Sequence, residues 1–390
     1  MMRRTLLFSL LALIGLSLYA QLDAYRRNIL TTVLVYHPED EFGTDIANAL
    51  DSLPAPDNYE TLALGALPEP NNHEPAASMA LRRIDNREVM GVQATDSGFY
   101  KAANGHALSE KEVLANALYT ERLLNLMGLA EQMIAAYRQQ TPLGNADEET
   151  LNHMFVLVHD ITYITSEQRL QVSTRTPKKL LGGLLDTFTG TTTKTTSSGS
   201  TPSDPFDGFK IKTHSYLYRL STDLSAEHTY RLQYVAHHYD FDERTVLVGQ
   251  YSRAERIRTL CARSIDRNIM ELGQTNEDFK AQIPVTEVLT DGKGHALGYA
   301  AKIGMRDGIS ETSKLMVVQR VTDPKTRAVT YRYVAMLKPV KGAIWDNRYN
   351  ALAEQSEGAA LTYTTFKKIG GGNILPGMLL VDGRYSKTRE

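Results

Sequence analysis

The sequence predicts an α+β protein in which an α/β-type body with long helices, residues 21–282, precedes a small β-barrel-like domain, residues 283–390. Three observations support this prediction. In the first part, apolar strand patterns alternate with stretches that have apolar residues at helical spacing. In the second part, short strand patterns follow one another and are separated by turns rich in Gly and Asp. Finally, 42% of the 390 residues are hydrophobic and 23% are charged, a composition typical of globular proteins.

The body begins with an apolar run, ILTTVLVYH at residues 29–37, that is typical of a buried strand. Residues 42–53 follow with apolar side chains at helical spacing, and Thr44 is the expected N-cap. A strand that leads directly into a helix is a common ligand-binding corner in α/β folds. The connection, Pro38–Glu41, carries negative charge where a phosphate would need free amides, so no nucleotide site is predicted.

A long helix is predicted from Ser109 to about Arg138. Ser109 and Glu112 form the pattern of a capping box, in which the two side chains satisfy amides that have no partner within the helix. The apolar residues that follow form a stripe that suits packing on a sheet. The next element, MFVLVHDITYIT at residues 154–165, is apolar and β-branched and is expected to be a buried strand.

A second strand, residues 209–220, is separated from the first by a low-complexity insertion, residues 174–208. One interpretation is a surface loop whose leucines fold back on the body, because long insertions cost little entropy. The other is a segment with a basic lead that contacts a membrane or a neighbouring subunit. In the second interpretation the contact residues are Lys178, Lys179, Leu180, Leu181, Leu184, Leu185 and Phe188.

The body is expected to end with two strands and a helix. Residues 229–236 and 245–248 have strand patterns, and the segment HHYDFD between them is interpreted as a polar turn. Ser252 and Glu255 form a second capping box at the start of an amphipathic helix. Cys261, the only cysteine, lies on the apolar face of this helix, so we expect a small buried side chain and no internal disulfide.

Residues 1–20 have the three parts of a secretory signal peptide. Arg3 and Arg4 precede the apolar run Thr5–Leu18, and Tyr19-Ala20-Gln21 offers a cleavage site. The apolar run is shorter than the ~20 residues that a spanning helix needs, which disfavours an uncleaved anchor. We therefore expect export to the periplasm or to the periplasmic face of the outer membrane.

Few residues have the spacing of a catalytic or metal site. His237 and His238 form, with Asp240 and Asp242, the only local cluster of histidines and carboxylates, and no metal-binding helical spacing is present. We therefore predict no metal, no cofactor and no catalytic residue. A periplasmic hydrolase remains the second hypothesis, with a site between the two parts where these histidines or His159 meet carboxylates from elsewhere in the chain.

Trp345, the only tryptophan, lies in a polar segment of the second part, LKPVKGAIWDNRYNA. An exposed tryptophan beside Arg and Tyr is typical of a recognition hot spot. The candidate binding residues are therefore Trp345, Asp346, Arg348 and Tyr349. The alternative is a tryptophan that plugs one end of the β domain beside a polar turn.

The second part also resembles a known small barrel. GMRDGISETSKLMVVQRV at residues 304–321, VTYRYVAMLKPVKGAIWDNRY at 329–349 and GGGNILPGMLLVDG at 370–383 are similar to segments of bacterial envelope-assembly proteins, such as the carboxyl domain of flagellar assembly protein T. The first part resembles the α/β part of curli-secretion-type proteins. The whole chain is similar to an uncharacterised exported protein family of Gram-negative bacteria. The lipid-anchoring cysteine of the curli secretion pore is absent, so the resemblance does not imply a lipoprotein channel, and no functional residue is carried over from it.

Together these observations predict an exported, non-catalytic protein of the cell envelope that acts through a protein partner, in surface assembly or secretion. The net charge of −2 gives no electrostatic reason to expect nucleic acid. A third hypothesis is a membrane-docking or pore subunit built on the insertion at residues 174–208. The sequence leaves the oligomeric state open, a homo-oligomer included.

Overall fold

The structure, a computed structural model, describes ten segments of the chain. The signal-peptide prediction and the predicted contact residues at 178–188 lie outside them. The described residues are 27–37, 40–64, 80–83, 108–141, 148–165, 206–222, 230–247, 251–280, 282–323 and 329–382.

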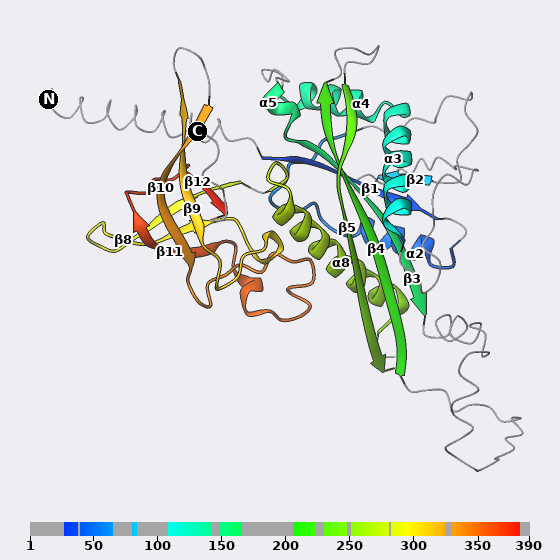
Figure 1. Cartoon of the computed structure of the whole chain (residues 1–390). Helices are drawn as coiled ribbons and strands as arrows, with labels where there is room; N and C mark the ends of the chain where they lie inside the picture. The colour runs from blue at the N-terminus through cyan, green and yellow to red at the C-terminus, as the bar shows by residue number, and fades with distance from the viewer. Residues whose placement is uncertain are drawn as a thin grey trace, which may run out of the picture.

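The first part is built on a five-stranded mixed sheet with the order β2-β1-β3-β4-β5 (Figure 1). β1 and β3 run parallel, and the other neighbours are antiparallel. The strands are β1 (Ile29–Tyr36), β2 (Ala80–Arg83), β3 (Met154–Thr165), β4 (Phe206–Thr222) and β5 (Tyr230–Leu247).

Helices cover both faces of this sheet. Along β3, Val156 and Val158 pack in one core with α3 and α4, whereas Phe155 and Leu157 pack in another core with α2 and α8. This accounts for the continuous apolar run of β3, because a strand that is buried on both sides cannot alternate with polar residues. The helices are α2 (Gly43–Asp51), α3 (Glu110–Leu126), α4 (Leu129–Gln140), α5 (Glu148–Leu151) and α8 (Arg253–Thr275).

Both capping boxes are confirmed, at Ser109 and at Ser252. The prediction of one long helix up to Arg138 is wrong, because the helix breaks at Gly128. This glycine has a φ of +62°, a left-handed conformation that other residues seldom adopt, and it separates α3 from α4. Thr44 is not the N-cap of α2 either, since Phe42 holds that position without a side-chain cap.

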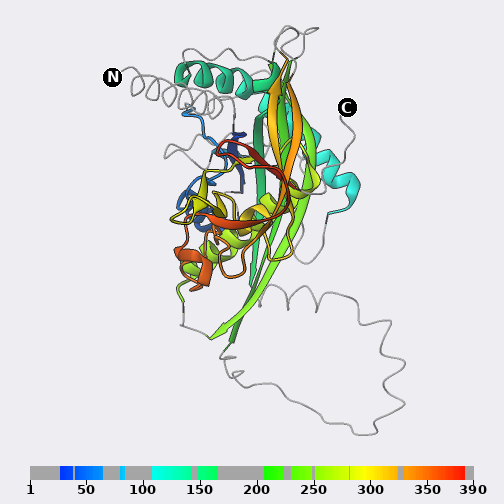
Figure 2. The ribbon, with the colours of Figure 1, turned by 90° about the vertical axis from the view of Figure 1, so that its left-hand side faces the viewer.

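The predicted polar turn between two strands is also wrong. Residues 237–242 lie inside a single strand, β5, and pair with residues 211–216 of β4. Local polarity suggests a turn, but partners on both faces of the sheet satisfy these side chains. His237 contacts His214, and Asp240 contacts Arg267 of α8. Both views show the far ends of β4 and β5 extending beyond the helices (Figures 1 and 2).

The second part is an antiparallel sheet of seven strands with the order β6-β12-β9-β10-β11-β8-β7, curled into a half-barrel. Its apolar concave side includes Val317, Leu337 and Phe366. The predicted α+β fold with a barrel-like carboxyl part is confirmed. The elements are β6 (Ile283–Pro284), β7 (Glu287–Thr290), β8 (Ala296–Ala301), η1 (Met305–Asp307), β9 (Leu315–Thr322), β10 (Val329–Pro339), η2 (Glu357–Ala360), β11 (Thr364–Gly371) and β12 (Leu379–Asp382).

Helix α8 lies between the two sheets (Figure 1). One side packs on β4 and β5, and its carboxyl half contacts η1 of the half-barrel. Within the described segments, no helix has both the length and the apolar character needed to cross a membrane. The two parts therefore meet along α8, and this junction holds the candidate site.

Candidate functional site: a cavity at the junction of the two parts

Arg306 of η1 is the centre of the junction. Its side chain is 4% exposed, and its Nε donates a hydrogen bond of 2.7 Å to Oδ1 of Asp266 on α8. The guanidinium stacks 4.0 Å from the ring centroid of Tyr349 and lies 3.6 Å from the carboxylate of Asp57. A buried guanidinium is tolerated only when it is paired, so these contacts hold three distant segments together.

Asp307 and Gly304 complete the turn around Arg306. The Asp307 carboxylate accepts hydrogen bonds from the Gly304 amide at 2.8 Å and from Nδ2 of Asn347 at 3.1 Å. Asn347 in turn accepts a hydrogen bond of 2.9 Å from the Arg306 amide. Burial raises the pKa of the Asp307 carboxyl above its ordinary value. Gly304 has no room for a side chain, because a Cβ would lie 2.5 Å from Oδ1 of Asn347.

The predicted binding residues lie in this same junction. The Trp345 amide donates to Oγ1 of Thr364, and its carbonyl accepts from the Met305 amide. Asp346 is 2% exposed. Burial alone would raise the pKa of the Asp346 carboxyl, but hydrogen bonds, two of them from the Arg348 side chain, outweigh burial and lower the pKa.

Tyr349 is held from both sides of the junction. Its amide donates a hydrogen bond of 2.9 Å to Oδ2 of Asp266, and its ring lies against Arg306. Burial raises the pKa of its phenol. Within the predicted segment, Arg348 is exposed, whereas Trp345 and Tyr349 are partly buried, so Arg348 is its most accessible residue.

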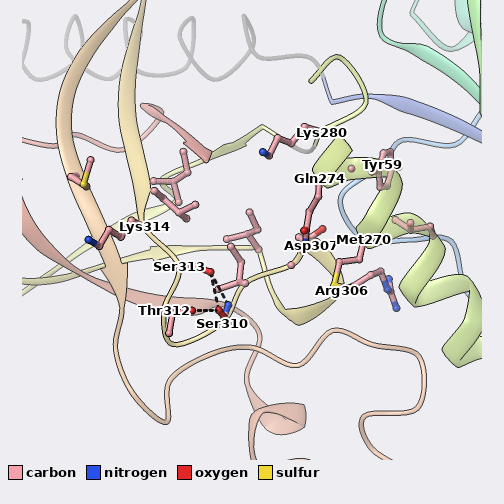
Figure 3. Close-up of a pocket in the computed structure, with 18 residues that line it drawn as sticks. Tyr59, Met270, Gln274, Lys280, Arg306, Asp307, Ser310, Thr312, Ser313 and Lys314 are labelled. Carbon is pink, nitrogen blue, oxygen red and sulfur yellow. Dashed lines mark hydrogen bonds between the residues drawn. The ribbon is translucent and has the colours of Figure 1, made fainter. Parts of the chain in front are cut away.

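A cavity of about 570 Å³ opens beside Arg306 (Figure 3). Gln274 and Lys280 line it from the side of α8, whereas Ser310, Ser313 and Lys314 line it from the loop that leads into β9. Most of the other lining residues are apolar or aromatic: Tyr59, Ile269, Met270, Ile303, Ile309, Leu315, Met336 and Leu380.

A second cavity, of about 770 Å³, lies on another side of Arg306 and has balanced charges. Its arginines are largely paired already, since Arg263 contacts Glu354 and Arg348 contacts Asp346. The cavity beside Ser310 and Lys314 is therefore the better candidate for a charged ligand.

The predicted histidines do not line either cavity. His159 is completely buried in β3, where Nδ1 lies 2.7 Å from Oγ of Ser215, and burial lowers its pKa to about 3. Nε2 of His237 lies 2.9 Å from Nδ1 of His214, and burial, with the neighbouring histidines, lowers the pKa of His237 to about 3. Both histidines are therefore neutral in the folded protein at neutral pH.

The carboxylates of the predicted cluster point to the opposite face. Asp240 accepts hydrogen bonds from both Ser264 and Arg267 on α8. Asp242 lies 3.5 Å from Arg267. Cys261 is buried as predicted, and burial raises the pKa of its thiol. The cluster is thus divided between the two faces of β5 and does not converge on one point.

Sequence reasoning missed the residues of the cavity. Arg306 falls within the segment 304–321, which the sequence relates only to a small barrel, and no local pattern indicates that its partners lie on α8 and at Asp57. The one available signal is the hydroxyl-rich run from Ser310 to Ser313, which ends beside Lys314.

No family model matches this chain, and a search of curated proteins gives no match either. By its architecture, this chain is a two-part α+β protein whose mixed sheet and half-barrel are joined through the buried Arg306.

Proposed function

We propose that this protein is exported to the cell envelope and acts there by binding a protein partner, without catalysis. The observation that favours this function is a pair of exposed tyrosines on β10. Tyr331 and Tyr333 are 45% and 53% exposed, and residues two apart on a strand share one face. Exposed tyrosines are typical of protein interfaces, because each combines a large rigid ring with a polar hydroxyl.

The roles of the candidate catalytic side chains also favour a binding function. His159 and His237 are enclosed in the sheet, and Asp240 holds α8 against β5 through Arg267. These groups stabilise the fold, whereas the hydrolase hypothesis needs the histidines at a site between the two parts.

Site-specific crosslinking in intact cells tests the proposal. A photoreactive phenylalanine analogue replaces Tyr333, or Tyr251 as a control that is 50% exposed but lies on the first part. We expect a product of one defined mass from position 333 that is absent from position 251 and from a Tyr331→Ser variant. A product of twice the chain's mass would identify a second copy as the partner.

The same strains test the rest of the proposal. Release of the protein with the periplasmic fraction supports export, whereas an intact Met1 form in the cytosol would overturn it. Placing the crosslinker at Arg348 tests the binding segment predicted around Trp345. Absence of any product from positions 333 and 348 would refute binding through the half-barrel.

A further inference from the structure

We propose that the 570 Å³ cavity beside Ser310 and Lys314 binds a small amphipathic anion, a phosphate or carboxylate head joined to an apolar body. The volume falls within the range of roughly 300 to 1,000 Å³ that is usual for small-molecule sites. Both parts of the protein build it, α8 on one side and the loop into β9 on the other.

The charge of the lining favours an anion. Three cationic side chains, Lys280, Arg306 and Lys314, face one carboxyl, that of Asp307. Arg306 is set against Asp266, whereas the ammonium group of Lys314 has no ion pair in the described part of the chain. The Asp307 carboxylate already accepts hydrogen bonds from Gly304 and Asn347, so it opposes an anion less than a free carboxylate would.

Hydroxyl groups beside Lys314 in the cavity wall can donate hydrogen bonds to a bound anion. Oγ of Ser310 lies 3.0 Å from Oγ1 of Thr312 and 3.3 Å from Oγ of Ser313, and the Ser310 amide donates to Ser313. The Ser310 hydroxyl thus contacts the other two, and a hydroxyl can turn its proton toward a bound oxyanion. Lys314 follows directly and forms no ion pair within the described segments.

The backbone and a buried nitrogen shape the inner end. Gly308 has a φ of +82°, and a Cβ there would lie 2.6 Å from Nε2 of Gln274, so the turn brings the loop close to α8. NH1 of Arg306 is buried and makes no hydrogen bond within the described residues, since the Asp57 carboxylate lies 3.6 Å from it. A buried donor whose hydrogen bond is not made is costly, and an anion in this cavity adds a favourable field to it.

The remaining wall determines the rest of the ligand. Ile269, Ile303, Ile309 and Leu315 line the same space. They favour an alkyl or aromatic body over a fully hydrated ion such as free phosphate, because burial of apolar surface contributes about 25 cal/mol per Å². The head group is therefore expected near Lys314 and the hydroxyls, with the apolar body against α8.

Titration calorimetry with octyl phosphate and the full chain tests this site. Octyltrimethylammonium has the same tail and the opposite charge, and inorganic phosphate has the head alone. We expect octyl phosphate to bind, the cation not to bind and phosphate to bind far more weakly. Lys314→Gln and Lys280→Gln should each weaken binding by roughly tenfold, as loss of a charge-assisted hydrogen bond does. Lys293→Gln, in the β7–β8 turn, should not change it.

Equal binding of the anion and the cation, an unchanged affinity in the two lining variants, or no binding to the wild type would each overturn the site. Flotation with phosphatidylglycerol vesicles distinguishes the source of the head group. Wild-type flotation that is lost in Lys314→Gln indicates a lipid ligand, whereas no flotation indicates a free molecule. The result is independent of the partner contact on β10, since Tyr331 and Tyr333 do not line the cavity.

Discussion

Replacing Arg306 with alanine should destabilise the whole junction. The substitution leaves Asp266, whose side chain is 5% exposed, without the guanidinium that accounts for one of its two hydrogen bonds. Burial already raises the pKa of Asp266 to about 6, which indicates how costly its charge is at this position. Removing Arg306 alone should therefore lower the free energy of unfolding more than removing the charges of both Arg306 and Asp266.

The structure sets the size of the effect. Breaking a buried ion pair from one side costs about 3 to 5 kcal/mol. The stacking on Tyr349 at 4.0 Å adds roughly 1 kcal/mol. A protein whose free energy of unfolding lies above about 6 kcal/mol, within the usual range of about 5 to 15 kcal/mol, survives such a loss, and its variant is then measurable in urea. Arg306→Met with Asp266→Asn removes both charges while keeping much of the volume, and should recover at least about 1.5 kcal/mol relative to the sum of the two single variants.

Tryptophan fluorescence reports this transition directly. Trp345 is the only tryptophan of the chain, and its carbonyl accepts a hydrogen bond from the Met305 amide beside Arg306. Unfolding curves of the wild type, of Arg306→Met, of Asp266→Asn and of the double variant yield the coupling energy. A loss below about 1 kcal/mol in Arg306→Ala, or strictly additive single variants, would refute a buried pair that holds the two parts together.

Three further predictions concern pH, space and the insertion. His159 and His237 have folded-state pKa values of about 3, below the ordinary 6.5, so the unfolded chain binds more protons below pH 6.5. The stability that depends on these neutral histidines is fully present above pH 6.5 and is lost as the pH falls toward 3. At pH 5 the free energy of unfolding is lower by about 2 kcal/mol for each histidine. Urea unfolding at pH 7 and 5 measures this, and a smaller loss in His159→Gln supports the assignment. Gly304→Ala should lower the melting temperature by several degrees, because its Cβ would meet Asn347 and Trp345, whereas Gly292→Ala, with nothing within 4 Å, should not. Deletion of residues 177–205 should abolish membrane association if the membrane-docking hypothesis holds, and unchanged fractionation would exclude it.

The sequence predicts correctly those helices and strands that are determined by residues close together in the chain. The capping boxes at Ser109 and Ser252 need only four consecutive residues each, and both form. The strand predicted at 154–165 matches β3 because its unbroken apolar run reflects burial on both faces. One of the predicted turns rich in Gly and Asp lies at Asp291, whose carboxylate accepts hydrogen bonds from the amides of Lys293 and His295.

Signals failed where a distant partner decides the structure. The segment HHYDFD has the polarity of a turn, yet β4 and α8 provide partners for it on both faces of the sheet, and the strand continues. Gly128 divides α3 from α4 although the apolar spacing runs through it. The spacing of apolar residues does not indicate the position at which a helix breaks.

The candidate site illustrates the same limit in its strongest form. Arg306 meets Asp266 across 40 residues of sequence, and Tyr349 meets the same carboxylate across 83. One carboxylate of α8 thus accepts hydrogen bonds from two segments of the half-barrel, beside the cavity that the two parts build. Ligand binding and junction stability are therefore linked: an anion that binds the folded chain alone raises the free energy of unfolding by RT ln(1 + [L]/Kd). Octyl phosphate should accordingly shift the Trp345 transition to higher urea in the wild type and much less in Lys314→Gln.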